Sequence, residues 1–117
     1  MQRGQLVIVS AQGDYGKPRP AVVIQNSRLL DQVDSVTVCF LTTRTVPARN
    51  LRVTIKPDAL NGLLETSQVQ IEKIMTFPCS KVRGPIGQLS ENEMRDIDRY
   101  LMIFLDLLPP APLALAD

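Results

Sequence analysis

The side chains best suited to chemistry in this chain are an arginine, a threonine and a glutamate that each adjoin a predicted strand. Arg19 stands between two prolines in the tetrapeptide Lys17-Pro18-Arg19-Pro20, so few backbone conformations are open to it. Its guanidinium is a planar, permanently charged fork that suits a phosphate group. A loop arginine is also often the partner of a nearby carboxylate, and the tetrapeptide alone leaves both interpretations open.

Two further strand ends carry polar groups that could assist such a site. Thr42 follows a predicted strand at 35–41, and its hydroxyl could donate a hydrogen bond to a phosphate oxygen or to a developing oxyanion. Glu72 ends an alternating run and precedes Lys73, so its carboxylate could act as a general base. Each residue also has a plain structural interpretation, as a polar strand end or a solvated charge. None of these signals is specific by itself.

The amino-acid composition removes several kinds of chemistry. Histidine is absent, which takes away the commonest zinc ligand and the commonest general base. Cys39 and Cys79 belong to no CxxC motif or Cys/His cluster, and we interpret both as small buried or half-buried apolar residues. We therefore expect no metal site and no cofactor. Catalysis would have to rest on Arg, Lys, Thr, Ser, Tyr and carboxylate side chains.

Length and charge narrow the class of protein further. The 117 residues, 44% of them hydrophobic, predict one domain with a real core that is marginal without a partner. No run of about 18 apolar residues and no signal-peptide pattern is present, so we expect a cytoplasmic protein without a membrane segment. Residues 1–56 carry a net charge of +5 and the remainder −4, which permits a polyanion-binding face in the first half.

The elements that must position these residues are predicted to be short strands followed by one helix. Apolar or alternating runs indicate strands at 5–10, 21–25, 35–41, 52–55 and 67–72, with further short strands around 75–77 and 85–89. Turn-rich loops at 11–20 and 57–62 separate them, and one helical turn is expected at 26–31. A chain of many short strands favours a mainly β fold, either a small curled sheet or a barrel.

The clearest single element is the C-terminal helix. Its apolar residues recur at spacings of three and four, which predicts a stripe facing a core: Met94, Ile97, Leu101, Phe104, Leu105 and Leu108. Ser90 and Glu93 form a capping-box pattern at its start. Pro109 and Pro110 are expected to end it, and residues 109–117 are predicted to be a flexible tail.

The order of these motifs resembles that of toxins of the MazF/PemK type. The resemblance rests on Arg-Gly at 3–4 before an apolar strand, on Arg-Pro-Ala-Val-Val-Ile-Gln-Asn at 19–26, and on the strand 38–42 that ends in Leu-Thr. Later matches are Gly62-Leu63, the strand 69–72 and the segment 86–90 that leads into the helix. The similarity spans residues 3–106. We therefore assign residues 1–108 to one domain of this type.

Membership of this family would imply an SH3-like small barrel with a C-terminal α-helix that works as a homodimer. It would also imply a sequence-specific, metal-independent endoribonuclease, or mRNA interferase, that cuts single-stranded RNA. In that reaction the ribose 2′-OH attacks the adjacent phosphorus and leaves a 2′,3′-cyclic phosphate and a 5′-OH. By the resemblance, Arg19 and Thr42 take the catalytic positions, and Glu72 takes an acidic position sometimes proposed as the base. RNA contacts are expected from Lys17, Thr43, Arg44, Arg49 and Lys73, and a cognate acidic antitoxin is the implied partner protein.

The chain departs from the family pattern at Met75, where an arginine is usual, so Lys73 or Arg44 would have to supply the missing phosphate contact. The loop at 11–18 is shorter than in many relatives, and the cleavage sequence does not carry over. Two other interpretations stay open. One is a CcdB-type toxin that shares the fold and binds DNA gyrase without nuclease activity, and the other is a binding module without catalysis. The presence of both Arg19 and Thr42, and the absence of tryptophan, favour the ribonuclease.

Overall fold

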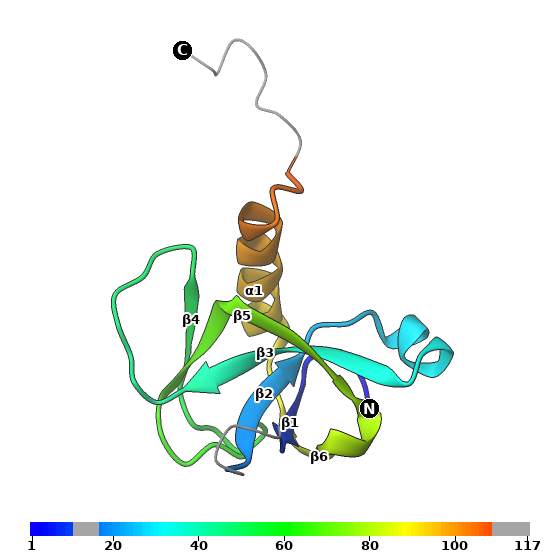
Figure 1. Cartoon of the computed structure of the whole chain (residues 1–117). Coiled ribbons are helices and arrows are strands. Elements are labelled where there is room, and N and C mark those ends of the chain that lie inside the picture. The colour runs from blue at the N-terminus through cyan, green and yellow to red at the C-terminus, as the bar shows by residue number, and fades with distance from the viewer. Residues whose placement is uncertain (11–16, 109–117) are drawn as a thin grey trace.

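The computed structural model describes residues 1–10 and 17–108, which form a curled antiparallel sheet with a long helix standing on it (Figure 1). In these ranges the strands are β1 (Gln5–Val9), β2 (Arg19–Val23), β3 (Ser35–Thr42), β4 (Arg52–Ile55), β5 (Ser67–Pro78) and β6 (Val82–Gln88). The helix α1 spans Glu91–Phe104, and short 3-10 helices lie at Ser27–Gln32 and Cys79–Lys81. The strand order is β4-β5-β3-β2-β1-β6, and all neighbours are antiparallel. The predicted mainly β fold with a C-terminal helix is confirmed.

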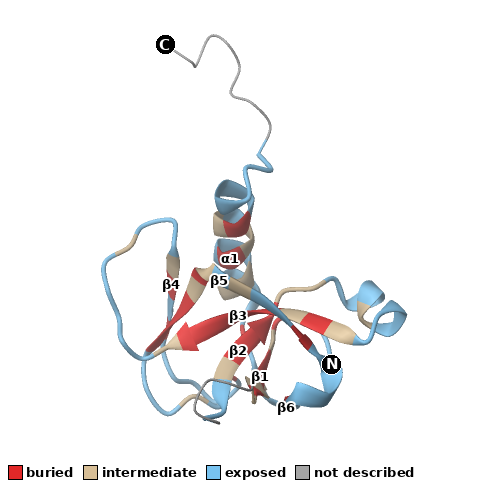
Figure 2. Cartoon of the chain, viewed as in Figure 1, coloured by how far each residue is buried: buried red, intermediate tan, exposed pale blue. Residues whose placement is uncertain are grey.

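The central strands bury both of their faces, which explains why they are so uniformly apolar (Figure 2). Successive side chains of a strand point to opposite sides of the sheet. Val22 and Leu41 therefore enter a core under α1, whereas Val23 and Phe40 enter a second core on the other side. Ile97 of α1 belongs to the first core and is fully buried. The helix thus covers one face of the sheet, while the curl of the strands encloses the other.

In the described part of the chain the sheet does not close into a continuous barrel, because its edge strands β4 and β6 are not paired with each other. The loop after β4 fills the gap instead. Its buried Asn61 accepts hydrogen bonds from the backbone N–H groups of Asp58 (3.2 Å) and Leu63 (3.0 Å). The Gln88 N–H of β6 then donates to the Leu60 carbonyl of this loop at 2.9 Å. The expected small barrel is realised as a curled sheet whose opening is sealed by a loop.

The strand β5 is longer than predicted, since it runs through the region where the sequence indicated two separate strands. Its first half pairs with β4 and with the end of β3, and its second half pairs with the start of β3. Between the halves the register shifts, so that Leu41 lies opposite Val69 but Cys39 lies opposite Ile74. The additional residues on β5 form a bulge that bends the strand. This bulge interrupts the alternation on which the prediction relied.

The start of α1 agrees with the prediction, but the predicted stripe is only partly buried. The Ser90 hydroxyl accepts from the Glu93 N–H at 3.1 Å, and the Glu93 carboxylate accepts from the Ser90 N–H at 2.9 Å, which completes the capping box. Ile97 and Leu101 are buried against the sheet. Further along, the side chains predicted to face the same core are 44–49% exposed: Phe104, Leu105 and Leu108. The C-terminal turns of α1 project beyond the strands (Figure 1).

The end of α1 was predicted wrongly. The helix stops at Phe104 rather than at the prolines, because Asp106 adopts a left-handed conformation with a φ of 56°. The N–H groups of Asp106 and Leu107 turn back to the carbonyls of Ile103 and Met102, at 3.1 and 2.8 Å, in a Schellman arrangement. The predicted tail 109–117 and most of the predicted loop 11–20 lie outside the described residues. No helix in the described ranges is long and apolar enough to span a membrane.

Candidate functional site

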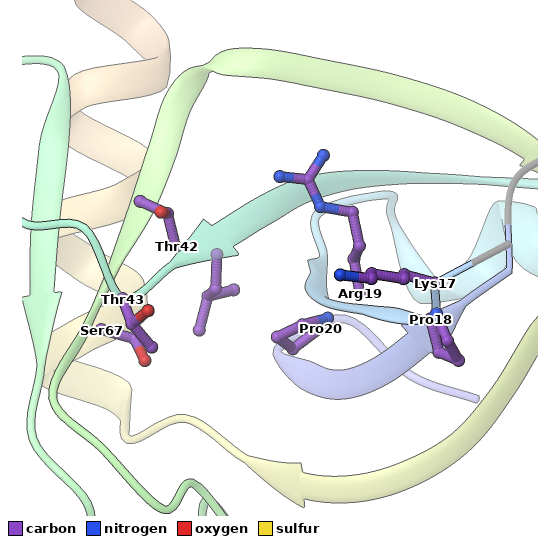
Figure 3. Close-up of a pocket in the computed structure, with 8 residues that line it drawn as sticks. Lys17, Pro18, Arg19, Pro20, Thr42, Thr43 and Ser67 are labelled. Carbon is purple, nitrogen blue, oxygen red and sulfur yellow. The ribbon is translucent and has the colours of Figure 1, made fainter. Parts of the chain in front are cut away.

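The end of β3 and the start of β2 border a pocket of about 420 Å³. Ala21 lies opposite Phe40 in this antiparallel pair, and the same register places Arg19 opposite Thr42 on one face of the sheet. The residues that line the pocket are Lys17, Pro18, Arg19, Pro20, Leu41, Thr42, Thr43 and Ser67 (Figure 3). Strand pairing therefore brings two separately predicted catalytic residues to the same pocket.

Arg19 is supported by an aromatic side chain that the sequence analysis did not single out. The guanidinium carbon lies 5.2 Å from the centre of the Phe40 ring, which is within the range of a cation–π contact. Phe40 is only 5% exposed and packs edge-on against Phe77, with ring centroids 5.6 Å apart. A buried ring thus orients an exposed guanidinium at the pocket. The available signal was that Phe40 precedes Thr42 by two residues and must share its face of β3.

The Thr42 hydroxyl is oriented by the backbone that follows it. Its oxygen accepts a hydrogen bond from the Arg44 N–H at 3.1 Å, a turn that hydroxyl side chains often make. Because a hydroxyl also has one proton to donate, Thr42 can donate into the pocket while this bond is kept. The buried Ser67 hydroxyl donates instead to the Glu65 carbonyl at 3.0 Å. Of these two hydroxyls, Thr42 is the one placed to serve a ligand.

Glu72 is not among the residues that line this pocket. Its carboxylate accepts three hydrogen bonds from Arg52 of β4, one from Nη2 at 3.0 Å and two from Nε at 3.3 and 3.4 Å. The Glu72 side chain is 27% exposed and the Arg52 side chain 14%, so the ion pair is largely shielded from water. Arg52 also donates to the Gln68 side-chain oxygen at 3.3 Å. The structure therefore places the expected base in an ion pair on the β4–β5 surface.

The residues expected to contact RNA are divided between the pocket and the surface beside it. Lys17 and Thr43 line the pocket, and Lys17 lies next to Arg19 (Figure 3). Arg44 is the next residue in the sequence after the pocket-lining Thr43, and Arg49 lies further along the exposed loop between β3 and β4. Lys73 is exposed on β5. An extended polyanion could meet several of these cations, whereas a single phosphate in the pocket could not.

The cysteines take different places in the structure. Burial, together with the nearby charge of Glu72 and against that of Arg3, raises the pKa of the Cys39 thiol to about 12. Cys39 is buried in the core, as predicted, and the raised pKa keeps its thiol protonated, whereas the prediction of burial is wrong for the exposed Cys79. Across residues 1–10 and 17–108, no three His, Cys, Asp or Glu side chains gather as a metal-binding group.

Comparison with known proteins relates this architecture to a family. Residues 2–105 match the family model described as PemK-like, MazF-like toxin of type II toxin-antitoxin systems. The chain is also 40% identical over 108 residues to a protein of Mycolicibacterium smegmatis named probable endoribonuclease MazF. That alignment covers 92% of this chain and 98% of the relative.

Solved structures share the fold at low sequence identity. The Mycobacterium tuberculosis toxin MazF-mt6 superposes with a TM-score of 0.75 at 22% identity, covering 87% of this chain and 96% of that one. A mycobacterial endoribonuclease in complex with its cognate antitoxin gives 0.79 at 23% identity, with 94% and 99% covered. MazF in a MazE–MazF structure from Deinococcus radiodurans gives 0.73 at 17% identity, with 92% and 98% covered.

These structures establish the fold, and the family match supports a MazF-type toxin over the CcdB-type alternative. The matched segment includes both β2 and β3, the strands that carry Arg19 and Thr42. The chain belongs to the family of PemK-like, MazF-like toxins of type II toxin-antitoxin systems.

Proposed function

We propose that this protein is a sequence-specific endoribonuclease that cleaves single-stranded RNA at the pocket between β2 and β3. The observation that carries the proposal is the meeting of Arg19 and Thr42 in one open pocket. Its support is the 40% identity to a protein named as a probable endoribonuclease. In this proposal residues 1–108 form the toxin domain, and the protein acts in the cytoplasm, where mRNA is available.

The pocket suits a reaction in which RNA supplies its own nucleophile. A bond forms from the ribose 2′-oxygen to phosphorus while the bond from phosphorus to the 5′-oxygen breaks. The 2′-hydroxyl gives up its proton, the 5′-oxygen gains one, and the products carry a 2′,3′-cyclic phosphate and a 5′-OH. Arg19 and Thr42 are donors fixed before the substrate arrives, so they stabilise the charge that builds on the phosphate oxygens.

The neighbouring cations extend the site to more than one nucleotide. Lys17 and Thr43 adjoin the scissile phosphate in this proposal, and Arg44, Arg49 and Lys73 meet phosphates on either side. Such contacts neutralise the RNA backbone and fix its register without reading bases themselves. Binding should therefore weaken as the salt concentration rises.

We further propose that the protein works as a homodimer and is inhibited by an acidic antitoxin. A patch on the end of α1 and the residues after it is 38–65% exposed although it is apolar: Met102, Ile103, Phe104, Leu105, Leu107 and Leu108. A second copy of the chain would remove this surface from water. An acidic antitoxin segment would occupy the β2–β3 pocket and the cationic surface beside it, as a mimic of the polyanion.

The proposal is tested by incubating the purified protein with a long single-stranded RNA in excess EDTA and mapping the new ends. We expect cleavage at a discrete short sequence. The new 5′ ends should accept phosphate from a polynucleotide kinase directly, and the new 3′ ends should resist ligation until the cyclic phosphate is opened and the remaining phosphate is removed. If EDTA abolished cleavage and added Mg²⁺ restored it, the result would contradict the metal-independent mechanism. Binding to gyrase without RNA cleavage would instead favour the CcdB-type interpretation.

A further inference from the structure

We propose that Gln68, held by the ion pair of Arg52 and Glu72, is a positioning residue that fixes the loop after β3 beside the active site. The inference rests on the proposed ribonuclease function, and it gives Glu72 a role other than general base. The side chains come from two neighbouring strands, β4 and β5, and the loop they hold is the one that carries Arg44.

The Gln68 side chain binds one residue of this loop from both ends. Its oxygen accepts from the Val46 N–H at 3.0 Å, and its nitrogen donates to the Val46 carbonyl at 3.0 Å. A single side-chain amide thus satisfies the backbone groups that a neighbouring strand would otherwise pair. Gln68 is 7% exposed whereas Val46 is 39% exposed, so losing the amide would free the Val46 backbone groups to exchange these partners for water and release the loop.

Arg52 and Glu72 determine which way this amide points. The Arg52 guanidinium has donors only, so its 3.3 Å bond from Nη1 requires the amide oxygen on its side. On the other side the amide nitrogen lies 3.3 Å from the Thr54 hydroxyl. Arg52 is fixed in turn by the Glu72 carboxylate at 3.0–3.4 Å. A chain of contacts therefore runs from Glu72 through Arg52 and Gln68 to Val46.

This series of contacts from Glu72 to Val46 ends next to the residues that are proposed to act on the phosphate. Gln68 lies directly opposite Thr42 in the register of β3 and β5. The loop leaves β3 after Thr42, and the Arg44 N–H in it orients the Thr42 hydroxyl. The backbone between Thr42 and Val46 is thus held at both ends, by the sheet and by the Gln68 amide. Without the amide, the segment that orients Thr42 would be held from one side.

The same geometry argues against Glu72 as the base that acts in this pocket. Glu72 is not among the residues that line the pocket, and its carboxylate is in an ion pair with Arg52. A general base must reach within hydrogen-bond distance of the proton that it removes, or act through one water. Both carboxylate oxygens of Glu72 instead accept hydrogen bonds from Arg52. Its contribution to cleavage would then pass through the loop.

Limited trypsin digestion measures how readily the loop between β3 and β4 leaves its native position, because trypsin cuts after the exposed Arg44 and Arg49. Gln68→Leu should speed cutting at these two bonds about tenfold or more, and the milder Gln68→Asn serves if the leucine variant does not fold. Gln70→Leu makes the same kind of change two residues along β5 and is the matched control. It should be cut at the wild-type rate. Unchanged cutting in both Gln68 variants would overturn the proposal.

RNA cleavage supplies the second readout. Gln68→Leu should lower kcat by about 10- to 100-fold, the range expected when a catalytic group is misplaced, with a smaller change in KM. Glu72→Gln should lower kcat less and keep the shape of the wild-type pH profile. Loss of the acidic limb of that profile would identify Glu72 as the base and overturn the positioning role. If the wild-type protein cleaves no RNA, the proposed function fails, and the trypsin comparison decides on the loop contact alone.

Discussion

Replacing Arg19 with alanine should remove most RNA cleavage while the domain stays folded. The substitution deletes the contact of the guanidinium with the Phe40 ring, 5.2 Å away. A cation–π contact at an exposed site contributes about 0.5–1 kcal/mol. In a domain of about this size, 1 kcal/mol corresponds to about 4–8 °C in Tm. Loss of this contact should therefore account for only a few degrees of any decrease in Tm.

The loss of activity should be far larger than this loss of stability. Removing one preorganised donor to a developing oxyanion costs about 10²–10³-fold in kcat. Arg19→Lys keeps the charge but not the two-pronged geometry, so it should recover only part of the rate. Thr42→Val is nearly isosteric and lacks the hydroxyl, and we expect a smaller loss than for Arg19→Ala.

The assay pairs single-turnover cleavage of a short fluorogenic RNA with thermal melting of each variant by circular dichroism. The informative quantity is the ratio of the two effects. If Arg19 were only a structural ion-pair partner, the pattern would reverse, with a lowered Tm and near-normal turnover. Wild-type cleavage by a well-folded Arg19→Ala variant would refute the assignment of the site and favour a toxin that acts by binding a protein.

Other predictions follow from single features of the structure. Gly62→Ala should lower the free energy of unfolding in urea by at least about 2 kcal/mol, because Gly62 has a φ of 68° and an added Cβ would lie 2.4 Å from the Ile86 carbonyl oxygen; an unchanged urea midpoint would contradict this packing. In native protein at pH 8 a thiol reagent should label Cys79 and spare Cys39 until the chain unfolds, and labelling of both would show that the core opens. Because the Cys39 pKa is about 12 in the fold and 9.0 ordinarily, unfolding favours loss of its proton, and stability should fall as the pH rises above about 9. Light scattering should give twice the 13.0 kDa chain mass, and Phe104→Glu in the apolar patch should shift it toward the monomer; a wild-type monomer at micromolar concentration would exclude the proposed dimer.

The sequence predicted the elements well where one physical signal dominated. The capping box at Ser90 and Glu93 is local, so it could be recognised from four consecutive residues. The length of β5 could not be predicted from its own residues. The bulge near Ile74 depends on pairing with Cys39 of β3, which is more than 30 residues away in the chain. The exposure of Phe104 was hidden for a related reason. Helical periodicity shows that residues share a face, but it does not show where the covering sheet ends.

The site shows the same division between local and distant information. Arg19 and Thr42 were identified separately, and their meeting follows from a strand register that the sequence does not state. The partner of Glu72 was missed because Arg52 lies 20 residues earlier and reaches it only across the β4–β5 pair. Phe40 was missed because a buried aromatic residue cannot be distinguished from an ordinary core residue until it is known that Arg19 lies over its ring.

The termination of α1 by its own backbone has a practical consequence for work in cells. The left-handed turn at Asp106 and the two hydrogen bonds that close it involve residues up to Leu107. A helix stopped in this way does not propagate into whatever sequence is attached after residue 108. A fluorescent reporter joined there through a flexible linker would leave the helix stop unchanged. Its attachment point lies about 40 residues in sequence after Ser67, the last residue that lines the β2–β3 pocket. Because it adjoins the apolar patch at 102–108, toxin abundance and growth arrest can be followed with the same molecule once the fusion has been shown to keep the oligomeric state of the untagged protein.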